Sequence, residues 1–541
     1  MKKMQCQECQ KTFTITNQDE EFFKKIKIPI PRQCPDCRQQ RRLAWRNERF
    51  LYKRNCDFCN KEMISLYSAD SKYKIYCKDC WWSDKLDALE YGIDFNLKED
   101  FFNQFNNLLL KVPRLGFIVS HGENSDYCTY SVYYKNSYLC ISGVVGENIL
   151  YSYWVNDSTD CCDCATSYKL EKCYECLDCN NLFHSLFCKD CENSSYLNFC
   201  TDCLGCNNCI GCIGLRHKDN YIFNKPVKKD EYHKYLIKIL SSRTTINAFL
   251  KKTDNFFKKN PYIFNIIQDS ENCTGNYIYN SKNSQNCFDG INLENCRNCW
   301  NIPQGSKESY DINYSPKTEL CYNSMSVVNG NNVYNSWNSW DDQLCKYCID
   351  CFYSRNLFGC IGLKHEENCI LNKKYSESDY KKIKTKIIKE MKKYGEFFPG
   401  SISPFAYNET IAQDFFPLKK EQAETRGWKW KETISDSVHD SVIRQKNTKK
   451  CTDCGKVFKY IQQELDFYED MGLPKPNKCF SCRHLDRLKL RNPNKLWHRQ
   501  CMCTQPDHGH DGQCKNEFET TYSPERKELI YCEECYKKEI Y

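Results

Sequence analysis

Residues 164–212 read CATSYKLEKCYECLDCNNLFHSLFCKDCENSSYLNFCTDCLGCNNCIGC, with a cysteine at every twelfth position. The phase extends upstream, where Ser152 replaces one cysteine. The column comprises Cys128, Cys140, Cys164, Cys176, Cys188, Cys200 and Cys212. A short fixed period with small residues in register is typical of a β-solenoid, whose equivalent side chains stack about 4.8 Å apart. We therefore predict a β-solenoid over residues 125–220, called block 1.

Other columns share this period. A second cysteine column and a column of asparagines at the end of the unit comprise Cys179, Cys191 and Cys203, and Asn136, Asn148, Asn208 and Asn220. A second stretch, residues 272–368, has asparagines in the same end position after a one-residue slip: Asn283, Asn295, Asn332, Asn356 and Asn368. Its last units carry Cys345, Cys348, Cys351 and Cys360. We predict that this stretch, block 2, is a second β-solenoid.

The two blocks end on related sequences. The matching segments are CIGLRH (212–217) with CIGLKH (360–365), and IFNK (222–225) with ILNK (370–373). Each block then continues into a Lys-rich helical pattern, at roughly 229–241 and 377–394. Stacked repeats need their open ends covered, so we expect these helices to cap the blocks.

The cysteines of the blocks have more than one possible role. We favour packing, because free cysteine behaves as a small buried hydrophobe and suits a thin interior. Metal binding and a disulfide ladder remain alternatives, and an iron–sulfur cluster is conceivable around Cys200 to Cys212. The spacing does not require such a cluster.

The N-terminal region, residues 1–85, carries cysteines in C-x2-C pairs. They are Cys6 with Cys9, Cys34 with Cys37, Cys56 with Cys59, and Cys77 with Cys80. Two such pairs supply the four thiolates of a tetrahedral zinc site. We predict two zinc ions in this N-terminal module.

Residues 447–541 repeat the arrangement. The corresponding cysteines are Cys451 with Cys454, Cys479 with Cys482, Cys501 with Cys514, and Cys532 with Cys535. The separations between successive pairs agree residue for residue in the two regions, which indicates an internal duplication. We predict two zinc ions in this C-terminal module and about four in the chain.

One knuckle of the C-terminal module is expanded. The insertion between Cys501 and Cys514 carries three further candidate ligands, Cys503, His508 and His510. Alignment favours Cys501 as the ligand, and Cys503 is its main competitor. The fourth site thus has more candidate ligands than one ion needs.

A hairpin follows each first knuckle, and a helix follows the second, in a treble-clef order. The N-terminal segments CQECQKTF (6–13) and PRQCPDCR (31–38) resemble probable zinc-ribbon or treble-clef domains of uncharacterised bacterial proteins. The segments CTDCGKVF (451–458) and CFSCR (479–483) repeat this resemblance. It covers about a quarter of the chain and implies zinc binding, without an activity that could be carried over.

Arginines recur on the two helices after the second knuckles. They are Arg38, Arg42 and Arg46 in the N-terminal module, and Arg483, Arg487 and Arg491 in the C-terminal module. Residues four apart share a helical face, so each module is expected to carry an arginine stripe that suits phosphate contacts. A solvated helix face is the alternative. Block 1 is rich in acidic residues, and we do not expect it to bind nucleic acid.

No catalytic motif stands out. The sequence lacks a phosphate-binding GxxxxGK[ST] loop, a GxSxG elbow and an HExxH helix. His217 and His365 recur at the block ends, where a turn-capping role is more common than catalysis. Four-cysteine zinc sites also leave no open coordination position. We therefore expect no enzymatic activity and no small-molecule substrate.

Composition sets the remaining expectations. The chain has 541 residues, 42 cysteines and a formal net charge of +8. Its mean hydropathy of −0.74 and the lack of a long apolar run give no indication of a membrane span. The N-terminal sequence has no apolar signal segment, so we expect reduced thiols and a cytoplasmic location.

Together these features predict a mixed, β-rich chain. Its segments are the N-terminal module (1–85), a helical linker (86–124), block 1 (125–220), a helical cap and linker (221–271), block 2 (272–368), a second cap and linker (369–446) and the C-terminal module (447–541). We expect a non-enzymatic zinc protein that binds RNA or a ribonucleoprotein through the arginine stripes. The alternative is a protein-interaction scaffold that uses the repeat surface.

Overall fold

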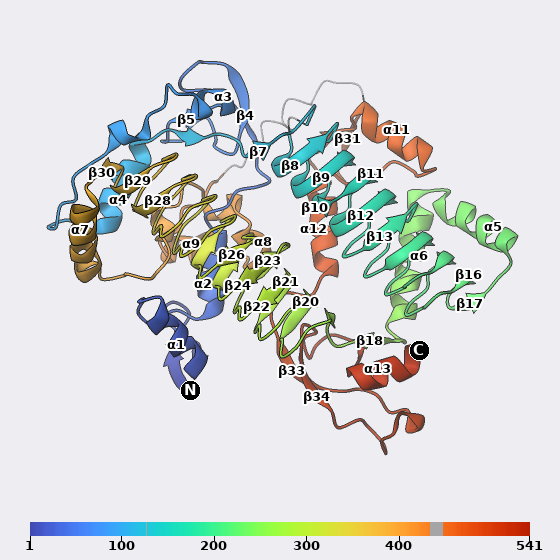
Figure 1. Ribbon diagram of the computed structural model, residues 1–541. Helices are drawn as coiled ribbons and strands as arrows, with labels where there is room; N and C mark the ends of the chain where they lie inside the picture. The colour runs from blue at the N-terminus through green and yellow to red at the C-terminus, as the bar shows by residue number, and fades with distance from the viewer. Residues whose placement is uncertain (126, 433–446) are drawn as a thin grey trace. The chain divides into compact units, whose positions relative to one another are not determined.

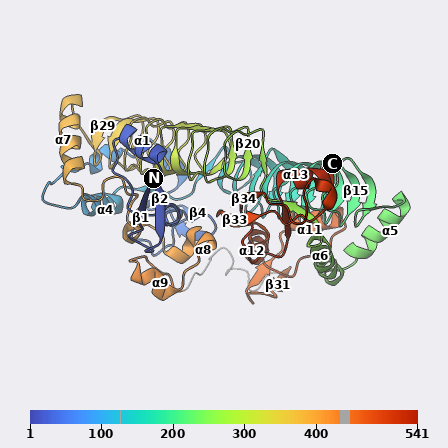
Figure 2. The ribbon, with the colours of Figure 1, turned by 90° about the horizontal axis from the view of Figure 1, so that it is seen from below.

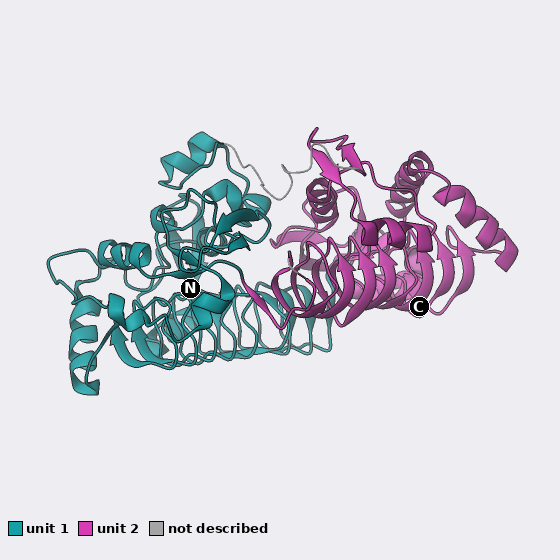
Figure 3. Cartoon of the chain, turned by 90° about the horizontal axis from the view of Figure 1, so that it is seen from above, with its two compact units in different colours: residues 1–117, 265–434 teal, residues 118–264, 435–541 magenta. Residues whose placement is uncertain are grey.

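The computed structural model describes residues 1–125, 127–432 and 447–541. The chain divides into two compact units, each made of two separate segments (Figure 3). Unit 1 comprises Met1–Phe117 and Asn265–Ile434, and unit 2 comprises Ile118–Phe264 and Ser435–Tyr541. Unit 1 therefore combines the N-terminal module with block 2, and unit 2 combines block 1 with the C-terminal module. Residues 433–446 of the predicted second linker lie outside the described residues.

Block 1 is a ladder of mostly parallel strands (Figure 1). Its strands are β7 (Val119–Ser120), β8 (Thr129–Lys135), β9 (Ile141–Leu150), β10 (Tyr153–Asn156), β11 (Ser158–Cys162), β12 (Ala165–Tyr174), β13 (Asn180–Phe183), β14 (Glu192–Asn198), β15 (Asn207–Ile210), β16 (Asp219–Ile222) and β17 (Lys225–Pro226). Cys161 pairs with Cys173, and Leu182 pairs with Ser194. This offset of twelve residues is the one that the cysteine column predicts. The ladder extends about half a unit beyond each predicted end.

Block 2 has the same parallel pairing, and Figure 2 shows its regular stack of rungs between β20 and β29. Its strands are β19 (Ile267–Gln268), β20 (Gly275–Tyr279), β21 (Cys287–Ile291), β22 (Leu293–Glu294), β23 (Trp300–Ile302), β24 (Ser306–Lys307), β25 (Tyr310–Asn313), β26 (Thr318–Glu319), β27 (Tyr322–Met325), β28 (Arg355–Phe358), β29 (Glu367–Ile370) and β30 (Lys373–Lys374). The offset is eleven residues at Ile267↔Ile278 and thirteen at Trp300↔Asn313. The thirteen-residue offset accounts for the one-residue slip in the asparagine column between Asn295 and Asn332.

In both blocks, residues with a left-handed backbone conformation recur at three-residue spacing over long stretches. The twelve-residue period of the sequence does not reveal this shorter spacing. From Tyr130 to Phe223, and again from Glu308 to His365, every third residue has a positive φ. Each twelve-residue unit therefore has four corners. Asparagine, aspartate and histidine tolerate this conformation better than other side chains do. The asparagine columns are thus explained by backbone geometry.

The residue after each corner points into the block. In block 1 these residues form one buried core, made mostly of cysteines with aliphatic residues between some of them. None of the 42 cysteines of the chain, all of which lie among the described residues, forms a disulfide. Cys188 Sγ donates to the carbonyl oxygens of Leu186 and Leu197, each at 3.4 Å. At equivalent inward positions, serine hydroxyls bond the next unit, as where Ser152 Oγ accepts from the Cys164 N–H at 3.1 Å. Cysteine and serine therefore fill equivalent inward positions.

Helices follow both blocks where the Lys-rich patterns predict them. They are α5 (Lys229–Leu240) after block 1 and α7 (Glu377–Glu390) after block 2, and α6 (Arg243–Phe257) is an additional helix in unit 2. The remaining connecting elements are β6 (Arg114–Leu115), α4 (Phe101–Lys111), β18 (Pro261–Ile263), α8 (Ala412–Phe415) and α9 (Lys420–Thr425). Within the described ranges, no helix combines the length and apolar character needed to cross a bilayer.

The two modules have the same order of elements. The N-terminal module contains β1 (Lys2–Gln5), β2 (Thr12–Ile15), α1 (Asn17–Lys25), α2 (Pro35–Leu43), β3 (Tyr52–Asn55), β4 (Glu62–Ser65), β5 (Ile75–Tyr76) and α3 (Lys78–Trp82). The C-terminal module contains β31 (Thr448–Lys450), β32 (Val457–Lys459), α11 (Gln462–Asp470), α12 (Phe480–Leu490), β33 (Trp497–Gln500), β34 (Glu517–Thr520), β35 (Leu529–Tyr531) and α13 (Glu533–Ile540). Antiparallel hairpins carry the first knuckles, and helices begin at the second.

Candidate metal centres and the arginine helices

The structure gathers the sixteen predicted cysteines into four groups of four, two in each module. Within each group all four sulfur atoms lie within 4.8 Å of one another. The groups are Cys6, Cys9, Cys34 and Cys37; Cys56, Cys59, Cys77 and Cys80; Cys451, Cys454, Cys479 and Cys482; and Cys501, Cys514, Cys532 and Cys535. Each group could hold a metal ion, and four thiolates suggest zinc.

Sulfur–sulfur distances agree with a tetrahedral ion. The Cys9–Cys34 and Cys454–Cys479 distances are 3.7 Å, and the Cys59–Cys77 distance is 3.8 Å. Zn–S bonds of about 2.3 Å give a tetrahedral edge of about 3.8 Å. The donors are therefore spaced as a zinc ion requires.

The backbone positions the thiols in the same way at all four centres. The first cysteine of each centre accepts the backbone N–H of the third, at 3.2–3.3 Å. That third cysteine is the N-cap of a helix in every case: Cys34 of α2, Cys77 of α3, Cys479 of α12 and Cys532 of α13. The N–H donors and the helix dipole favour thiolates, the form that binds metal.

In the fourth centre, Cys501 and Cys503 occupy different positions and belong to different donor groups. Cys501 has the same role as the first cysteine of the other centres, because its Sγ accepts the Cys532 N–H at 3.2 Å and its own N–H donates to Asn516 O at 2.8 Å. Cys503 instead joins His508, His510 and Cys535 in a further group of possible metal ligands. The insertion therefore adds a donor set without displacing Cys501.

The arginine helix of the C-terminal module lies against block 1. Arg483 Nε lies 2.8 Å from Asp163 Oδ2, and Arg487 Nη1 lies 2.8 Å from Asp163 Oδ1. Arg487 also contacts Glu175 at 3.3 Å, and Arg491 donates to Asp178 at 2.9 Å. The three acidic residues are corners of block 1 with positive φ. These three acidic side chains of block 1 are thus partners of the arginines within the chain.

The arginine helix of the N-terminal module lies against block 2 at equivalent positions. Arg38 forms a two-pronged ion pair with Asp311, with its Nη2 2.9 Å from Oδ2. Arg42 donates to Asn323 Oδ1 at 2.8 Å, and Arg46 donates to Ser326 Oγ at 2.8 Å. Asp311, Asn323 and Ser326 each lie 148 residues after Asp163, Glu175 and Asp178. The related block ends have the same separation, so the duplication includes this docking surface.

The spacing of the arginines along each helix is close to the spacing of the rungs in each block. Arginines four residues apart on a helix are separated by about 6 Å along its axis. Adjacent rungs of a β ladder are about 4.8 Å apart. A helix that crosses the rungs can therefore bring its first two arginines to corners of adjacent rungs, whereas the third arginine, at or beyond the helix end, meets the next corner of the second rung.

The expected phosphate-binding role of the stripes is not supported by their position. Five of the arginines, Arg38, Arg42, Arg46, Arg483 and Arg487, are at most 5% exposed. The side chain of the sixth, Arg491, is 12% exposed and is paired with Asp178. In addition, Arg46 lies beyond the end of α2, and Arg491 is the C-cap of α12. In this conformation the stripes are largely buried and contact the chain itself.

A second contact joins each module to the last rungs of its block. The left-handed Gly362 lies against Trp81 of α3, and the left-handed Gly214 lies against Tyr536 and Ile540 of α13. The neighbouring cations face the same aromatic residues: Lys364 Nζ lies 4.1 Å from the Trp81 ring centroid, and Arg216 Nη2 lies 3.4 Å from Tyr536 Oη. These contacts explain why the two blocks end alike.

Three aromatic residues near the arginine helices could in principle stack on bases: Trp45 and Tyr52 in unit 1, and Trp497 in unit 2. Trp45 and Tyr52 are buried, with Trp45 packed on Phe398 and the Tyr52 hydroxyl bonded to Glu409. Trp497 is half-buried under Lys495. These positions favour anchoring of the small zinc folds over base stacking.

The interior cysteines of the blocks do not form a metal site among the described residues. None belongs to a group of three or more donor atoms within metal-binding distance. Burial raises the pKa of the Cys188 thiol well above its usual value, which keeps it neutral. The surrounding carbonyl oxygens accept from such thiols. These observations support packing as their role.

His217 and His365 both occupy left-handed corners. His365 stacks on Tyr353 with ring centroids 5.0 Å apart, and His217 lies over Gly205. Both histidines therefore fill corner positions of the ladder.

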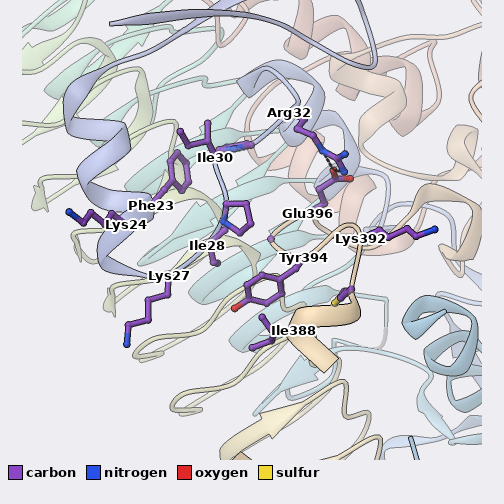
Figure 4. Close-up of a pocket in the computed structure, with 14 residues that line it drawn as sticks. Phe23, Lys24, Lys27, Ile28, Ile30, Arg32, Ile388, Lys392, Tyr394 and Glu396 are labelled. Carbon is purple, nitrogen blue, oxygen red and sulfur yellow. Dashed lines mark hydrogen bonds and ion pairs between the residues drawn. The ribbon is translucent and has the colours of Figure 1, made fainter. Parts of the chain in front are cut away.

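Unit 1 also contains a pocket between the ends of α1 and α7 (Figure 4). Phe23, Ile28 and Tyr394 line it, and the Arg32–Glu396 ion pair closes one side. The lysines at its edge, Lys24, Lys27 and Lys392, point in different directions (Figure 4). The pocket therefore lacks convergent polar groups of the kind that orient a small ligand.

No protein-family model matches the chain, and a search of curated proteins finds no significant match. The capacity of both ends to bind metal therefore rests on the geometry of the cysteine groups.

Proposed function

We propose that the chain is a non-enzymatic, zinc-dependent interaction scaffold, made of two β-solenoid blocks that are each braced by a zinc-ribbon or treble-clef module. The observation that carries this proposal is the equivalent burial of the two arginine helices on the two blocks. The basic faces are occupied within the chain, which favours a structural role for the modules. The partner surface is then the outer face of the blocks.

Exposed apolar side chains on the ladders support this surface. Tyr133 and Val145 occupy successive corners of one column of block 1 and are 55% and 47% exposed. His121 precedes them in the column and stacks on Tyr133 at 4.8 Å. Tyr353 of block 2 is 50% exposed. Exposed aromatic residues on a rigid ladder suit a protein partner better than a phosphate backbone.

The absence of an enzymatic role is part of the proposal. Four-cysteine centres leave no coordination position for a substrate. The recurrent histidines occupy corners of the ladder. RNA or a ribonucleoprotein remains the competing partner, and the proposed experiment distinguishes the two.

Photo-crosslinking in the native cells tests the partner class. A photoreactive phenylalanine analogue is placed at Tyr133, at Tyr353, or at the exposed control Phe58 of the N-terminal module. We expect one defined protein crosslinked from a block position and absent from the Phe58 control. Recovery of RNA, or the same products from all three positions, would reject the scaffold.

A further inference from the structure

The additional donor group of the C-terminal module shares a residue with the fourth centre. Cys501, Cys514 and Cys532 form one set with Cys535, and Cys503, His508 and His510 form another set with the same Cys535. Seven side chains thus make two sets of four with one thiolate in common. We propose that this module holds two zinc ions in one cluster, bridged by the Cys535 thiolate. The inference rests on the proposed zinc binding by the modules.

Seven ligands are the number that two tetrahedral ions need when they share one sulfur. The Cys503 Sγ–His508 Nδ1 distance is 3.1 Å, and the Cys535 Sγ–His510 Nε2 distance is 3.4 Å. Zinc–sulfur and zinc–imidazole bonds of about 2.3 and 2.0 Å give an edge of about 3.5 Å. The second donor set therefore approaches the geometry of one ion.

Each histidine has one nitrogen toward the cluster and the other near an outer partner. His510 Nδ1 lies 2.9 Å from the carbonyl oxygen of Gly512, which leaves Nε2 for a metal. His508 Nε2 lies 3.7 Å from the Glu539 carboxylate, which leaves Nδ1 for a metal. Metal-bound histidines commonly use such an outer carbonyl or carboxylate to fix the ring orientation. The two imidazoles would thus bind through opposite nitrogens.

The inserted loop is shaped to present these donors. It turns at two glycines with positive φ, Gly509 and Gly512, on either side of His510. Lys538 Nζ donates to the carbonyl oxygen of His508 at 2.6 Å, which ties the loop to α13. Cys503 is fully buried, and His508 is 8% exposed. A buried thiol and imidazole that face one another are the expected components of a filled site.

The other three centres provide an internal reference. Their first knuckles are short C-x2-C turns, in which the residue after the second cysteine bonds back to the first: Gln10 to Cys6, Asn60 to Cys56 and Gly455 to Cys451. The fourth knuckle bonds Cys514 N to Cys503 O at 2.9 Å instead. The insertion therefore places Cys503 at the base of the loop, beside the four-thiol centre. One ion is expected at each short knuckle and two at the expanded one.

Metal counting and cadmium NMR on the full chain test the cluster. Native mass spectrometry of the wild type should give five zinc ions. The His508→Ala/His510→Ala variant should lose one ion and keep four, because the Cys501 centre retains its four thiolates. His498→Ala is the matched control, since this exposed histidine lies on β33 between Glu517 and Glu519. It should keep five.

The bridge has its own measurement. After exchange with ¹¹³Cd, two resonances of the wild type should show scalar coupling through the shared sulfur, and the coupling should disappear in the double histidine variant. Four ions in wild type and variant alike would overturn the second site, and five ions without coupling would overturn the bridge. One ion or none in the wild type would instead reject zinc binding by the modules as a whole.

Discussion

In unit 1, Arg42 donates to the amide oxygens of Asn313 and Asn323, whereas its counterpart in unit 2, Arg487, lies between the carboxylates of Asp163 and Glu175. Burial lowers the pKa of Arg42 to about 10. Burial opposes the charge of Arg487 too, but Asp163 and Glu175 raise its pKa above the usual value. The middle arginine of the helix is therefore held mainly by neutral hydrogen bonds in unit 1 and by ion pairs in unit 2.

The contact of each module with its block is called a junction here. The features that the two junctions have in common indicate more clearly how a module holds its block. Asp163 and Asp311 are equivalent corners, both fully buried, and each meets the first arginine of its helix. An aromatic contact recurs beside them, as Phe23 of α1 meets Tyr322 edge-on at 5.3 Å, and Tyr468 of α11 meets Tyr174 at 5.8 Å. One aspartate and one edge-on aromatic pair thus define the common junction, and the remaining partners have diverged.

Zinc removal should have the largest effect and should act on both junctions. Structural zinc contributes about 10–16 kcal/mol to folding of small zinc domains, so chelation is expected to unfold both modules. Hydrogen exchange should then increase in α2 and α12 and in the corners beneath them, and much less in the interior of the blocks. Metal loss with unchanged hydrogen exchange in α2 and α12 would contradict the proposal that zinc holds each module folded against its block.

Neutralising the equivalent aspartates, Asp311 and Asp163, should lower the free energy of unfolding more in unit 1 than in unit 2. Among the described residues, Asp311 is the one carboxylate within 4.0 Å of Arg38 and Arg42. Arg483 and Arg487 retain Glu464 and Glu175 when Asp163 is changed. An unpaired buried charge costs about 3–5 kcal/mol, so we expect that loss for Asp311→Asn and about 1–3 kcal/mol for Asp163→Asn.

Chemical denaturation of the two variants measures this difference, with the exposed corner variant Asp157→Asn as control. The control should change the free energy of unfolding by less than about 0.5 kcal/mol. Equal losses for Asp311→Asn and Asp163→Asn would remove the distinction between the junctions.

The interiors of the blocks differ at one acid. Asp342 of block 2 takes the inward position that Ser194 takes in block 1, and both accept a backbone N–H of the next unit. Burial raises the pKa of Asp342 to about 7 from 3.8. Because the folded-state pKa is above the unfolded value, its stabilising contribution is fully present below about pH 4 and is lost progressively as pH rises from there through about 7.

We therefore expect block 2 to lose about 1 kcal/mol of stability between pH 6 and 8 through this group. Asp342→Ser should remove that loss, and Ser194→Asp should introduce it into block 1. Unfolding free energies at both pH values measure the effect. An unchanged pH dependence in Asp342→Ser would show that Asp342 does not titrate there.

The smallest effect is expected at an interior thiol. Cys188 is equivalent to Ser336, whose Oγ accepts the Cys348 N–H at 3.1 Å. Cys188→Ser should therefore change the unfolding free energy by less than about 1 kcal/mol and leave the zinc content unchanged. Loss of an ion in this variant would show that the interior cysteines bind metal.

The sequence predicts local chemistry better than it predicts partners. The cysteine spacing yields all four cysteine groups that could hold a metal ion, and the period of cysteine and asparagine yields the twelve-residue register. The three-residue spacing of the corners cannot be read from the sequence, because many corners hold residues such as Tyr130, Leu139 and Val145 that do not favour positive φ. Tertiary stacking imposes that conformation on them.

The pairing of modules with blocks could not be predicted from chain order. The N-terminal module joins block 2, which follows it after block 1, and the arginine stripes look like exposed basic faces when each helix is considered alone. A usable signal is the 148-residue separation between the block ends, which also relates Asp163 to Asp311. Burial of the arginines depends on that long-range contact.

Zero-length crosslinking of a lysine to a carboxylate tests the pairing most directly. Lys25 of α1 lies 2.8 Å from Glu308 of block 2, and both side chains are partly exposed. The equivalent position in block 1, 148 residues earlier, is Asp160. A carbodiimide should join Lys25 to Glu308, and Lys172 to Asp470 in unit 2, where the two groups are 3.3 Å apart. Crosslinks from Lys25 to Asp160 in the monomeric chain, without the Glu308 product, would contradict the proposed braces.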